Sequence, residues 1–474
     1  MSEILKPDLC VIGAGSGGLS VAAGAAQIGA SVVLIEKHKM GGDCLNYGCV
    51  PSKALLAAGK HAHHMRTGAP FGVTPVDPQI DFSKAMDHVH ETIAKIEPHD
   101  SVERFEGLGC TVIQAPAKFI NNREVEAGGK TVRPRRFVIA TGSRPAVPDI
   151  AGLADVPYFT NETLFENRAC PEHLIVLGGG PIGLEMAQAH HRLGARVTVL
   201  ARSTIASKED DELVAILRDQ LKNEGIEIVE QAQVQSCTKT VDGLAVRVLI
   251  DGAVREIAGS HLLVATGRVP NVEGLDLGAA GIAHQDCGIT VDKGLRTSNK
   301  RAFAIGDVTG GPQFTHVAGY HAGIIIRRTL FRTPAKADHS AVPRVTYTDP
   351  ELAQIGLTEE DAKAKNITTK IVEWPLSDND RAVAERIEHG LVKIICAPNG
   401  KILGAGLVGP GAGELMAPLI LAISQGLKIG AFASLIIPYP TLGEVPKRAA
   451  GSWYTPMLYS DRTRMIVKLL SKLG

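Results

Sequence analysis

Two copies of one strand, glycine-turn and helix pattern constrain the fold of this 474-residue chain more than any other feature. In the first copy, DLCVIGAGSGGLS (8–20), an apolar run leads into Gly13, Gly15 and Gly18 at G-x-G-x-x-G spacing. The first glycine allows a tight turn, the second lets the backbone approach a pyrophosphate, and the third lets the helix pack on the strand. Glu36 ends the next apolar run, where it could accept hydrogen bonds from ribose hydroxyls. This copy therefore predicts a dinucleotide site, with the helix N-terminus facing the phosphates.

The second copy has the same spacing of glycines after an apolar run. It reads HLIVLGGGPIGLEMAQ (173–188) and contains Gly178, Gly180, Pro181, Ile182 and Gly183. One such motif is weak evidence for a ligand, but two copies in the same strand–turn–helix context are strong evidence. The alternative is a pair of glycine turns in an α/β fold that binds nothing.

The two copies differ where the ribose would bind. Glu36 lies 23 residues after Gly13, whereas the same count from Gly178 reaches Ala201, which Arg202 follows. Loss of the acid, with Arg202 and Lys208 nearby, favours a 2′-phosphate. We therefore expect FAD at the first copy and NADPH at the second, with NADH possible if the two basic residues are only solvated surface charges.

Further motifs extend the expected cofactor sites. FVIATGSRP (137–145) and LLVATGRVPN (262–271) are both apolar runs that end on Ala-Thr-Gly, and AFAIGDVTG (302–310) ends at Gly306 and Asp307. An acid at such a strand end faces the ligand crevice of a parallel sheet. The other cofactor-binding candidates are Lys37, Gly42, Asp43, Lys53, Ala117, Thr141, Gly142, Ser143, Gly267 and Arg268.

A close pair of cysteines lies in GGDCLNYGCVPSK (41–53). On an ideal helix the Cα atoms of Cys44 and Cys49 would be roughly 8.7 Å apart, whereas a disulfide needs about 4.4–6.8 Å. The segment must therefore be distorted for a bridge to form, which Gly48 permits. Proximity to a helix N-terminus would favour reactive thiolates, although two buried structural cysteines are the alternative. A zinc site is a poor explanation, because no second cysteine pair completes the ligands.

Composition excludes several classes of protein. The chain carries 50 basic and 50 acidic residues, so its net charge gives no reason to expect nucleic acid or an anionic membrane. Eight scattered cysteines are too few for a disulfide-rich secreted scaffold, which favours the cytoplasm. Residues 9–35 are uncharged, but their glycines indicate a strand, turn, helix and strand rather than a membrane span. Residues 418–437 include Gln425 and Lys428 and predict an amphipathic helix rather than a span.

Taken together, these motifs resemble those of the class I pyridine nucleotide–disulfide oxidoreductases, a family that includes dihydrolipoamide dehydrogenase, glutathione reductase and mercuric reductase. The resemblance covers essentially the whole chain, and VPRVTYTDPELAQIGLTE (342–359) looks like the start of the family's dimerisation domain. It implies an α/β fold with two Rossmann-like dinucleotide-binding domains and an α+β C-terminal dimerisation domain in a homodimer. The expected boundaries are 1–150 for the FAD domain, 151–271 for the NAD(P) domain, 272–340 for a segment completing the FAD domain, and 341–474 for the interface domain.

The resemblance also implies a route for electrons, from NADPH through FAD to Cys49 and then Cys44, the thiol that meets substrate. Lys53 would lie near the flavin and pair with Glu185, because either charge alone is costly in a low dielectric. Two residues on exposed helix faces are the alternative for that pair.

The chain departs from the family pattern in IIPYPTLGEVPKRAAG (436–451), where Glu444 matches but Tyr439 replaces the expected histidine. If the site resembles the family's, Tyr439 of one subunit faces Cys44 of the other. To act as a base near neutral pH, a tyrosine would need its pKa lowered by about three units, roughly 4 kcal/mol. We therefore expect weak turnover of lipoamide or glutathione. A tyrosine at this place and the basic pair Arg202 and Lys208 resemble mercuric reductase. That enzyme delivers metal through a cysteine pair near its C-terminus, however, and no cysteine follows Cys396 here.

The sequence leaves three functions open. The first is reduction of a small disulfide or a soft metal ion by NADPH through Cys44 and Cys49. The second is a dihydrolipoamide dehydrogenase that oxidises or reduces lipoyl groups with NAD, and the third is a non-catalytic flavin-binding subunit. We assign no resident metal site, since a solvated helix face explains His61, His63 and His64 as well as metal ligation does.

Overall fold

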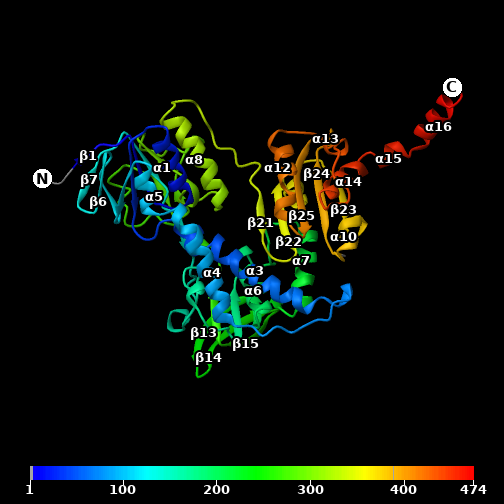
Figure 1. The fold of residues 1–474 in the computed structure, drawn as a ribbon, viewed down its shortest axis with the longest axis horizontal. Coiled ribbons are helices and arrows are strands. Elements are labelled where there is room, and N and C mark those ends of the chain that lie inside the picture. Colours follow the sequence, from blue (N-terminus) through cyan, green and yellow to red (C-terminus); the bar gives the residue numbers. More distant parts are fainter. Residues whose placement is uncertain (1–3, 388, 474) are drawn as a thin grey trace.

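The computed structural model describes residues 4–387 and 389–473. Its first sheet is parallel and has the order β20-β8-β2-β3-β4. The five strands are Ala302–Ala304, Arg136–Ile139, Leu9–Ile12, Val32–Glu36 and Cys110–Gln114 respectively. Helix α1 (Ser16–Gln27) packs beside α8 (Thr315–Thr329), as Figure 1 shows. Because β20 and α8 come from late in the chain, the segment after the second glycine motif returns to complete this unit.

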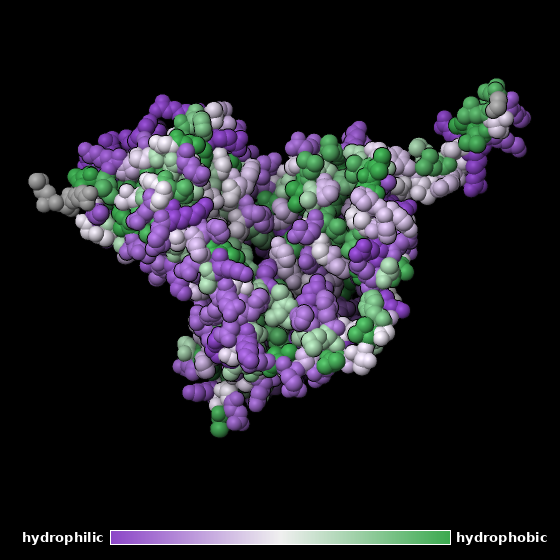
Figure 2. Space-filling model, viewed as in Figure 1, coloured by the Kyte–Doolittle hydropathy of each residue, from purple (hydrophilic) through white to green (hydrophobic). Residues whose placement is uncertain are grey.

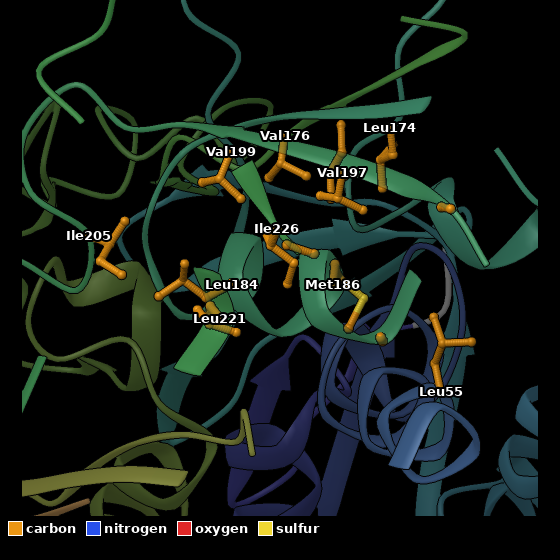
Figure 3. Packing of buried hydrophobic residues seen from close by; sticks show 14 of the residues in the cluster. Leu55, Leu174, Val176, Leu184, Met186, Val197, Val199, Ile205, Leu221 and Ile226 are labelled. Atoms are coloured by element: carbon orange, nitrogen blue, oxygen red, sulfur yellow. The ribbon is translucent and has the colours of Figure 1, made fainter. Parts of the chain in front are cut away.

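A second parallel sheet has the order β12-β11-β10-β16. Its strands are Glu227–Val229, Arg196–Leu200, His173–Leu177 and His261–Val264, and its helices are α6 (Pro181–Arg192) and α7 (Asp211–Glu224). Figure 3 shows Val176 and Val199 of the sheet facing Leu184 and Met186 of α6, with Leu55 at the edge of the same cluster. Since Leu55 belongs to α3 (Cys49–Arg66), the helix after the cysteines is fixed against the second unit by apolar packing.

The third sheet is antiparallel, in the order β21-β22-β25-β24-β23. Its strands are Arg344–Thr346, Glu351–Gly356, Ile402–Gly409, Leu391–Cys396 and Lys370–Pro375, with α14 (Glu444–Ser452) packed against it. Beyond α14, the helices α15 (Thr455–Leu458) and α16 (Asp461–Leu470) project away from the body (Figure 1).

The remaining elements complete these three units. They are β1 (Ile4–Leu5), α2 (Gly42–Asn46), α4 (Phe82–Ile96), α5 (Val102–Gly107), β5 (Ala117–Asn121), β6 (Glu124–Ala127), β7 (Lys130–Val132), β9 (Ser143–Pro145), β13 (Gln233–Thr240), β14 (Gly243–Ile250), β15 (Ala253–Gly259), β17 (Arg268–Pro270), β18 (His284–Gln285), β19 (Gly288–Ile289), α9 (Glu359–Ala364), α10 (Asp380–Ala384), α11 (Ala412–Leu415), α12 (Ala417–Ser424) and α13 (Gly430–Ala433).

Two sequence expectations about helices have different outcomes. The uncharged stretch 9–35 folds as β2, α1 and β3, which confirms the predicted strand, turn, helix and strand. The single helix expected over 418–437 is wrong, because the chain forms α12 and α13 with Gly426 at φ +64° between them. A left-handed glycine ends a helix readily, since it carries no Cβ. Among the described residues, no helix has both the length and the apolar character needed to cross a bilayer.

Candidate active site

The first glycine turn leaves no room for side chains. Gly13 has φ +104°, and a Cβ on it would lie 2.3 Å from the Ala140 carbonyl oxygen. A Cβ on Gly18 would lie 1.8 Å from the Gly13 carbonyl oxygen, so α1 packs directly on the turn. Gly15 precedes α1 without a side-chain cap, which leaves the first N–H groups of the helix available to an anion. The turn therefore fits a pyrophosphate.

Backbone hydrogen bonds orient the buried carboxylate of Glu36. Its Oε2 accepts from the Ala14 N–H at 2.7 Å, and its Oε1 accepts from the His38 N–H at 2.8 Å. A carboxylate has about four acceptor positions, so capacity remains for ribose hydroxyls. The end of β3 thus fits a nucleotide whose ribose is not phosphorylated.

The second turn repeats this geometry with a different strand end. Gly178 has φ +122° and a Cβ there would lie 2.3 Å from the Ala265 carbonyl oxygen, while one on Gly183 would lie 2.0 Å from the Gly178 oxygen. Ala201 is buried after β11, and the exposed Arg202 and Lys208 line the adjoining cleft. The strand end therefore offers cations where the first unit offers a carboxylate.

One continuous cleft of about 2190 Å³ runs past both turns. The sequence-predicted residues that line it are Gly13, Gly15, Glu36, Lys37, Gly42, Asp43, Cys44, Cys49, Lys53, Ala117, Thr141, Gly142, Ser143, Gly178, Gly180, Pro181, Ile182, Glu185, Arg202, Lys208, Gly267, Arg268, Gly306 and Asp307. Gly18 and Gly183 lie beneath the turns and fix them, whereas Tyr439 and Glu444 are not part of this lining.

Four of the candidates form a polar cluster across the cleft. The Ser143 hydroxyl donates to Asp307 at 2.6 Å and accepts from Arg268 Nε at 2.7 Å, and Arg268 Nη2 lies 3.1 Å from Asp43 Oδ1. Burial raises the pKa of Asp307, although Ser143 and Arg268 oppose the effect. The cluster brings two carboxylates, an alcohol and a guanidinium together, which are groups able to bind sugar or ribitol hydroxyls.

The helix is broken between the two cysteines, which is the distortion that a bridge between them would require. Helix α2 ends at Asn46 and α3 begins at Cys49, with Gly48 at φ −125° and ψ −106°. Gly42 presses on the first glycine turn, since a Cβ on it would lie 2.7 Å from the Gly15 Cα. The two glycines before Asp43 therefore hold the cysteine loop against the turn that fits a pyrophosphate.

The two thiols, free in this structure, have different acidities. The pKa of Cys49 falls to about 6, chiefly through its hydrogen bond with Cys44, and Thr315 and the charge of Lys53 lower it further. The Cys49 sulfur lies 3.3 Å from Thr315 Oγ1 at the start of α8. The pKa of Cys44 is raised, first by that shared hydrogen bond and then by burial. Near neutral pH, Cys49 is therefore a thiolate and Cys44 a thiol.

Lys53 and Glu185 are brought together, as the family resemblance implies. Lys53 Nζ lies 2.8 Å from Glu185 Oε2, and the Glu185 side chain is 5% exposed. The second oxygen of Glu185 accepts from the Tyr347 N–H at 3.0 Å, and Lys53 Nζ lies 4.3 Å from the centre of the Tyr347 ring. The pair links the cysteine helix, the second nucleotide unit and the third sheet.

Tyr439 lies outside the cleft of its own chain and is 66% exposed. Its hydroxyl donates to Asp380 Oδ2 at 2.8 Å, and this hydrogen bond raises the pKa of Tyr439. Glu444 is buried at the start of α14, where its carboxylate lies 3.6 Å from Arg448. Their position agrees with a role at another subunit's site, which stays a prediction.

Sequence reasoning missed Thr315, Tyr347 and Asp380 as functional candidates. Thr315 and Tyr347 contact residues 266 and 162 positions away in the chain, and no spacing rule links such distant residues. The available signals were weak: Tyr347 lies in the segment that resembles the start of the dimerisation domain, and Thr315 follows the Gly-Asp motif. Within the described part of the chain, no three His, Cys, Asp or Glu side chains gather in a metal-binding group.

Comparisons with known proteins agree with this geometry. Two family models match, the pyridine nucleotide-disulphide oxidoreductase model over residues 7–322 and the dimerisation domain of the same family over 342–450. A mercuric reductase of Streptomyces lividans is 35% identical over 451 residues, covering 94% of this chain and 95% of the relative. A dihydrolipoyl dehydrogenase of Geobacillus stearothermophilus is 33% identical over 460 residues, covering 94% of this chain and 96% of the relative.

Among solved structures, the Cu(II) complex of the HOCl-induced flavoprotein disulfide reductase RclA from Escherichia coli is similar. It superposes with a TM-score of 0.83 at 27% identity, covering 93% of this chain and 98% of that chain. The dimerisation-domain match supports a homodimer. On its matched family models and its relatives of nearly equal length, the chain belongs to the pyridine nucleotide-disulphide oxidoreductase family.

Proposed function

We propose that the protein oxidises NADPH and passes the electrons through Cys44 and Cys49 to a soft metal ion held by thiolates. The observation that carries the choice of acceptor is the hydrogen bond from Tyr439 to Asp380. Bound FAD would supply the two-electron carrier between nucleotide and thiols, with Glu36, Asp307 and the first glycine turn holding it.

The choice of acceptor depends on protons. Reducing a disulfide takes two electrons and two protons, and NADPH supplies two electrons with one proton as hydride. A dithiol–disulfide substrate therefore needs an acid–base group, which the family's histidine provides. Tyr439 stands in that place, and Asp380 raises its pKa above an already high value. A dication reduced to the neutral metal takes two electrons and no proton, so this tyrosine does not impede it.

The thiols suit such an acceptor. Thiolates are the ligands that soft metal ions prefer, and the pKa of Cys49 near 6 keeps it ionised at neutral pH. Metal binding would also displace the proton of Cys44, whose pKa is raised. The relatives add support, since one curated relative is a mercuric reductase and one similar structure is a Cu(II) complex.

Arg202 and Lys208 support NADPH as the donor. Both line the cleft at the end of β11, where the first unit has Glu36. Charge-assisted hydrogen bonds from these two residues would favour a 2′-phosphate over a free ribose hydroxyl.

The test is anaerobic NADPH oxidation by flavin-loaded enzyme, with thiol-complexed Hg(II) and with lipoamide in parallel. We expect oxidation that depends on Hg(II) and is abolished in Cys44→Ala, and much slower turnover with lipoamide. Tyr439→His is the matched variant, because it should raise lipoamide turnover and leave the Hg(II) rate unchanged. Wild-type lipoamide turnover faster than the Hg(II) rate would assign the protein to dihydrolipoamide chemistry instead. The absence of any change in the flavin absorbance on adding NADPH would indicate a non-catalytic subunit.

A further inference from the structure

The C-terminal arm, defined as residues 455–473, carries an apolar face that its own chain leaves uncovered. Figure 2 shows the arm standing clear of the body with apolar residues on its surface. Six aliphatic side chains of α16 and the turn after it are each at least 44% exposed, namely Met465, Ile466, Val467, Leu469, Leu470 and Leu473. This much exposed apolar surface on one short helix indicates that something covers it.

The arm is a formed helix rather than a frayed end. The Ser460 hydroxyl caps α16 by accepting from the Thr463 N–H at 3.3 Å. The base of the arm is fixed to the third sheet, where Lys370 donates to the Trp453 carbonyl at 3.1 Å and lies 4.2 Å from the centre of its ring. The apolar face is therefore presented at a defined place on the molecule.

The polar face of the same helix is basic. Arg464, Lys468 and Lys472 recur every fourth residue, so they form one row along the helix, and Met465, Leu469 and Leu473 form the adjacent row. Residues 455–474 contain four basic residues and one acid, whereas the whole chain has equal numbers of both. The acid, Asp461, lies 3.7 Å from Arg464 in an exposed pair that contributes little.

We propose that the C-terminal arm docks the enzyme on the surface of an anionic phospholipid bilayer. A helix with an aliphatic face and a polar face of Lys and Arg lies in the headgroup region, where the apolar side chains enter the acyl boundary and the cations meet lipid phosphates. Tyr459, 69% exposed just before α16, suits the same interface. This mode of membrane binding requires no helix that spans the bilayer.

Charge favours lipid over a second copy of the chain as the occupant. Lysines are depleted from the centres of protein interfaces, whereas the polar face here is a row of cations. Pairing two arms of a dimer would also bring eight basic residues into one small region, since each arm carries four. A homodimer would instead present two arms to one bilayer and so increase the avidity of binding.

The test is sedimentation of flavin-loaded enzyme with phosphatidylcholine vesicles, with or without phosphatidylglycerol. We expect binding only to the anionic vesicles, weakened by salt, and roughly fivefold weaker for each basic residue removed. The variant Arg464→Glu, Lys468→Glu, Lys472→Glu should not bind. A control with Lys95→Glu, Arg255→Glu and Lys300→Glu, which changes three exposed cations elsewhere, should bind nearly as wild type does.

A second variant, Leu469→Ser with Leu470→Ser, tests whether the apolar face of the arm binds lipid or the partner subunit. It should lose vesicle binding while its native mass and the reduction of its flavin by NADPH stay unchanged. The proposal is overturned if wild type fails to sediment with anionic vesicles, or if this variant dissociates to monomers. Dissociation would assign the apolar face to the partner subunit. Because flavin reduction is measured separately, either result leaves the proposed function untouched.

Discussion

The two nucleotide units have the same backbone and different strand ends. In each, a positive-φ glycine lies where a Cβ would come within 2.3 Å of the carbonyl oxygen of an Ala-Thr-Gly alanine. Each helix is preceded by an extended glycine, at φ −82° for Gly15 and −81° for Gly180. In the first unit β3 ends on Glu36, whereas in the second unit Ala201 and Arg202 follow the end of β11. The turn thus fits a pyrophosphate in general, and we expect the residues at the strand end to distinguish one nucleotide from the other.

A second difference lies at the start of the helices. Glu185, two residues after Gly183, is buried and reaches Lys53, whereas the equivalent residue of the first unit, Ser20, only donates back to the Ser16 carbonyl. The first unit contacts the cysteine loop through Gly42, and the second contacts the cysteine helix through this ion pair. The cysteines are therefore fixed to both units, which is the arrangement a relay between two cofactors needs.

The largest expected effect comes from adding a methyl group to either turn. Gly13→Ala should lose the flavin, whereas Gly178→Ala should keep the flavin but lose its reduction by NADPH. Each change forces a Cβ onto a carbonyl oxygen at positive φ, which we expect to cost about 3 kcal/mol or more locally. The flavin-to-protein ratio and anaerobic bleaching by NADPH measure the two losses.

Gly24→Ala is the matched control for those variants. A Cβ on Gly24, in the middle of α1, would meet Ile326 at an ordinary 3.6 Å. Alanine is the better helix former by about 1 kcal/mol, so this variant should load flavin and react normally. Retention of NADPH-driven bleaching by Gly178→Ala would show that the second turn does not hold the nucleotide.

The next effect concerns the strand ends. Arg202→Ala with Lys208→Ala should raise the KM for NADPH roughly 10- to 100-fold and leave the KM for NADH nearly unchanged, since two charge-assisted hydrogen bonds are lost. Arg196→Ala serves as the control, because Arg196 is exposed on β11 but does not line the cleft. Equal loss with both nucleotides would mean that the basic pair does not distinguish them.

A pH titration tests how the cysteines are coupled to each other. In reduced enzyme the thiolate absorbance of Cys49, taken as the difference from Cys49→Ser, should appear as pH rises through about 6. Cys44→Ala should move this midpoint upward, because the hydrogen bond from Cys44 is the largest cause of the low pKa. Cys287→Ala, at an exposed cysteine elsewhere, should leave it in place. An unmoved midpoint in Cys44→Ala would contradict the assigned cause.

The smallest effect is expected at Tyr347. Tyr347→Leu removes the ring beside Lys53 but keeps the backbone N–H that Glu185 accepts. The loss of a partly exposed cation–π contact should cost about 0.5–1 kcal/mol, which for a chain of 474 residues is a fall of about 1 °C or less in the melting temperature of the holoenzyme. A loss of activity as large as that of Gly178→Ala would mean that Tyr347 acts on the cofactor itself.

Local patterns were predictable from the sequence, and contacts between distant segments were not. Glycine spacing identified both turns, because the constraint is local and steric. Cα geometry indicated that the segment must be distorted if Cys44 and Cys49 form a bridge, and the structure has such a break at Gly48. The contact of Thr315 with Cys49 depends on how the segment after the second unit returns to the first sheet. The apolar pattern over 418–437 gave no indication that Gly426 adopts a left-handed conformation and ends the helix. The net charge of zero gave no indication that the C-terminal arm is basic.

The most direct test of the account is a thiol count after anaerobic addition of one equivalent of NADPH to oxidised, flavin-loaded enzyme. If the two units deliver electrons to the cysteine pair, wild type should gain two titratable thiols after denaturation, and Cys44→Ala should gain none. Bleaching of the wild-type flavin without any new thiols would contradict the account, because the two electrons would then stay on the flavin instead of passing to Cys44 and Cys49.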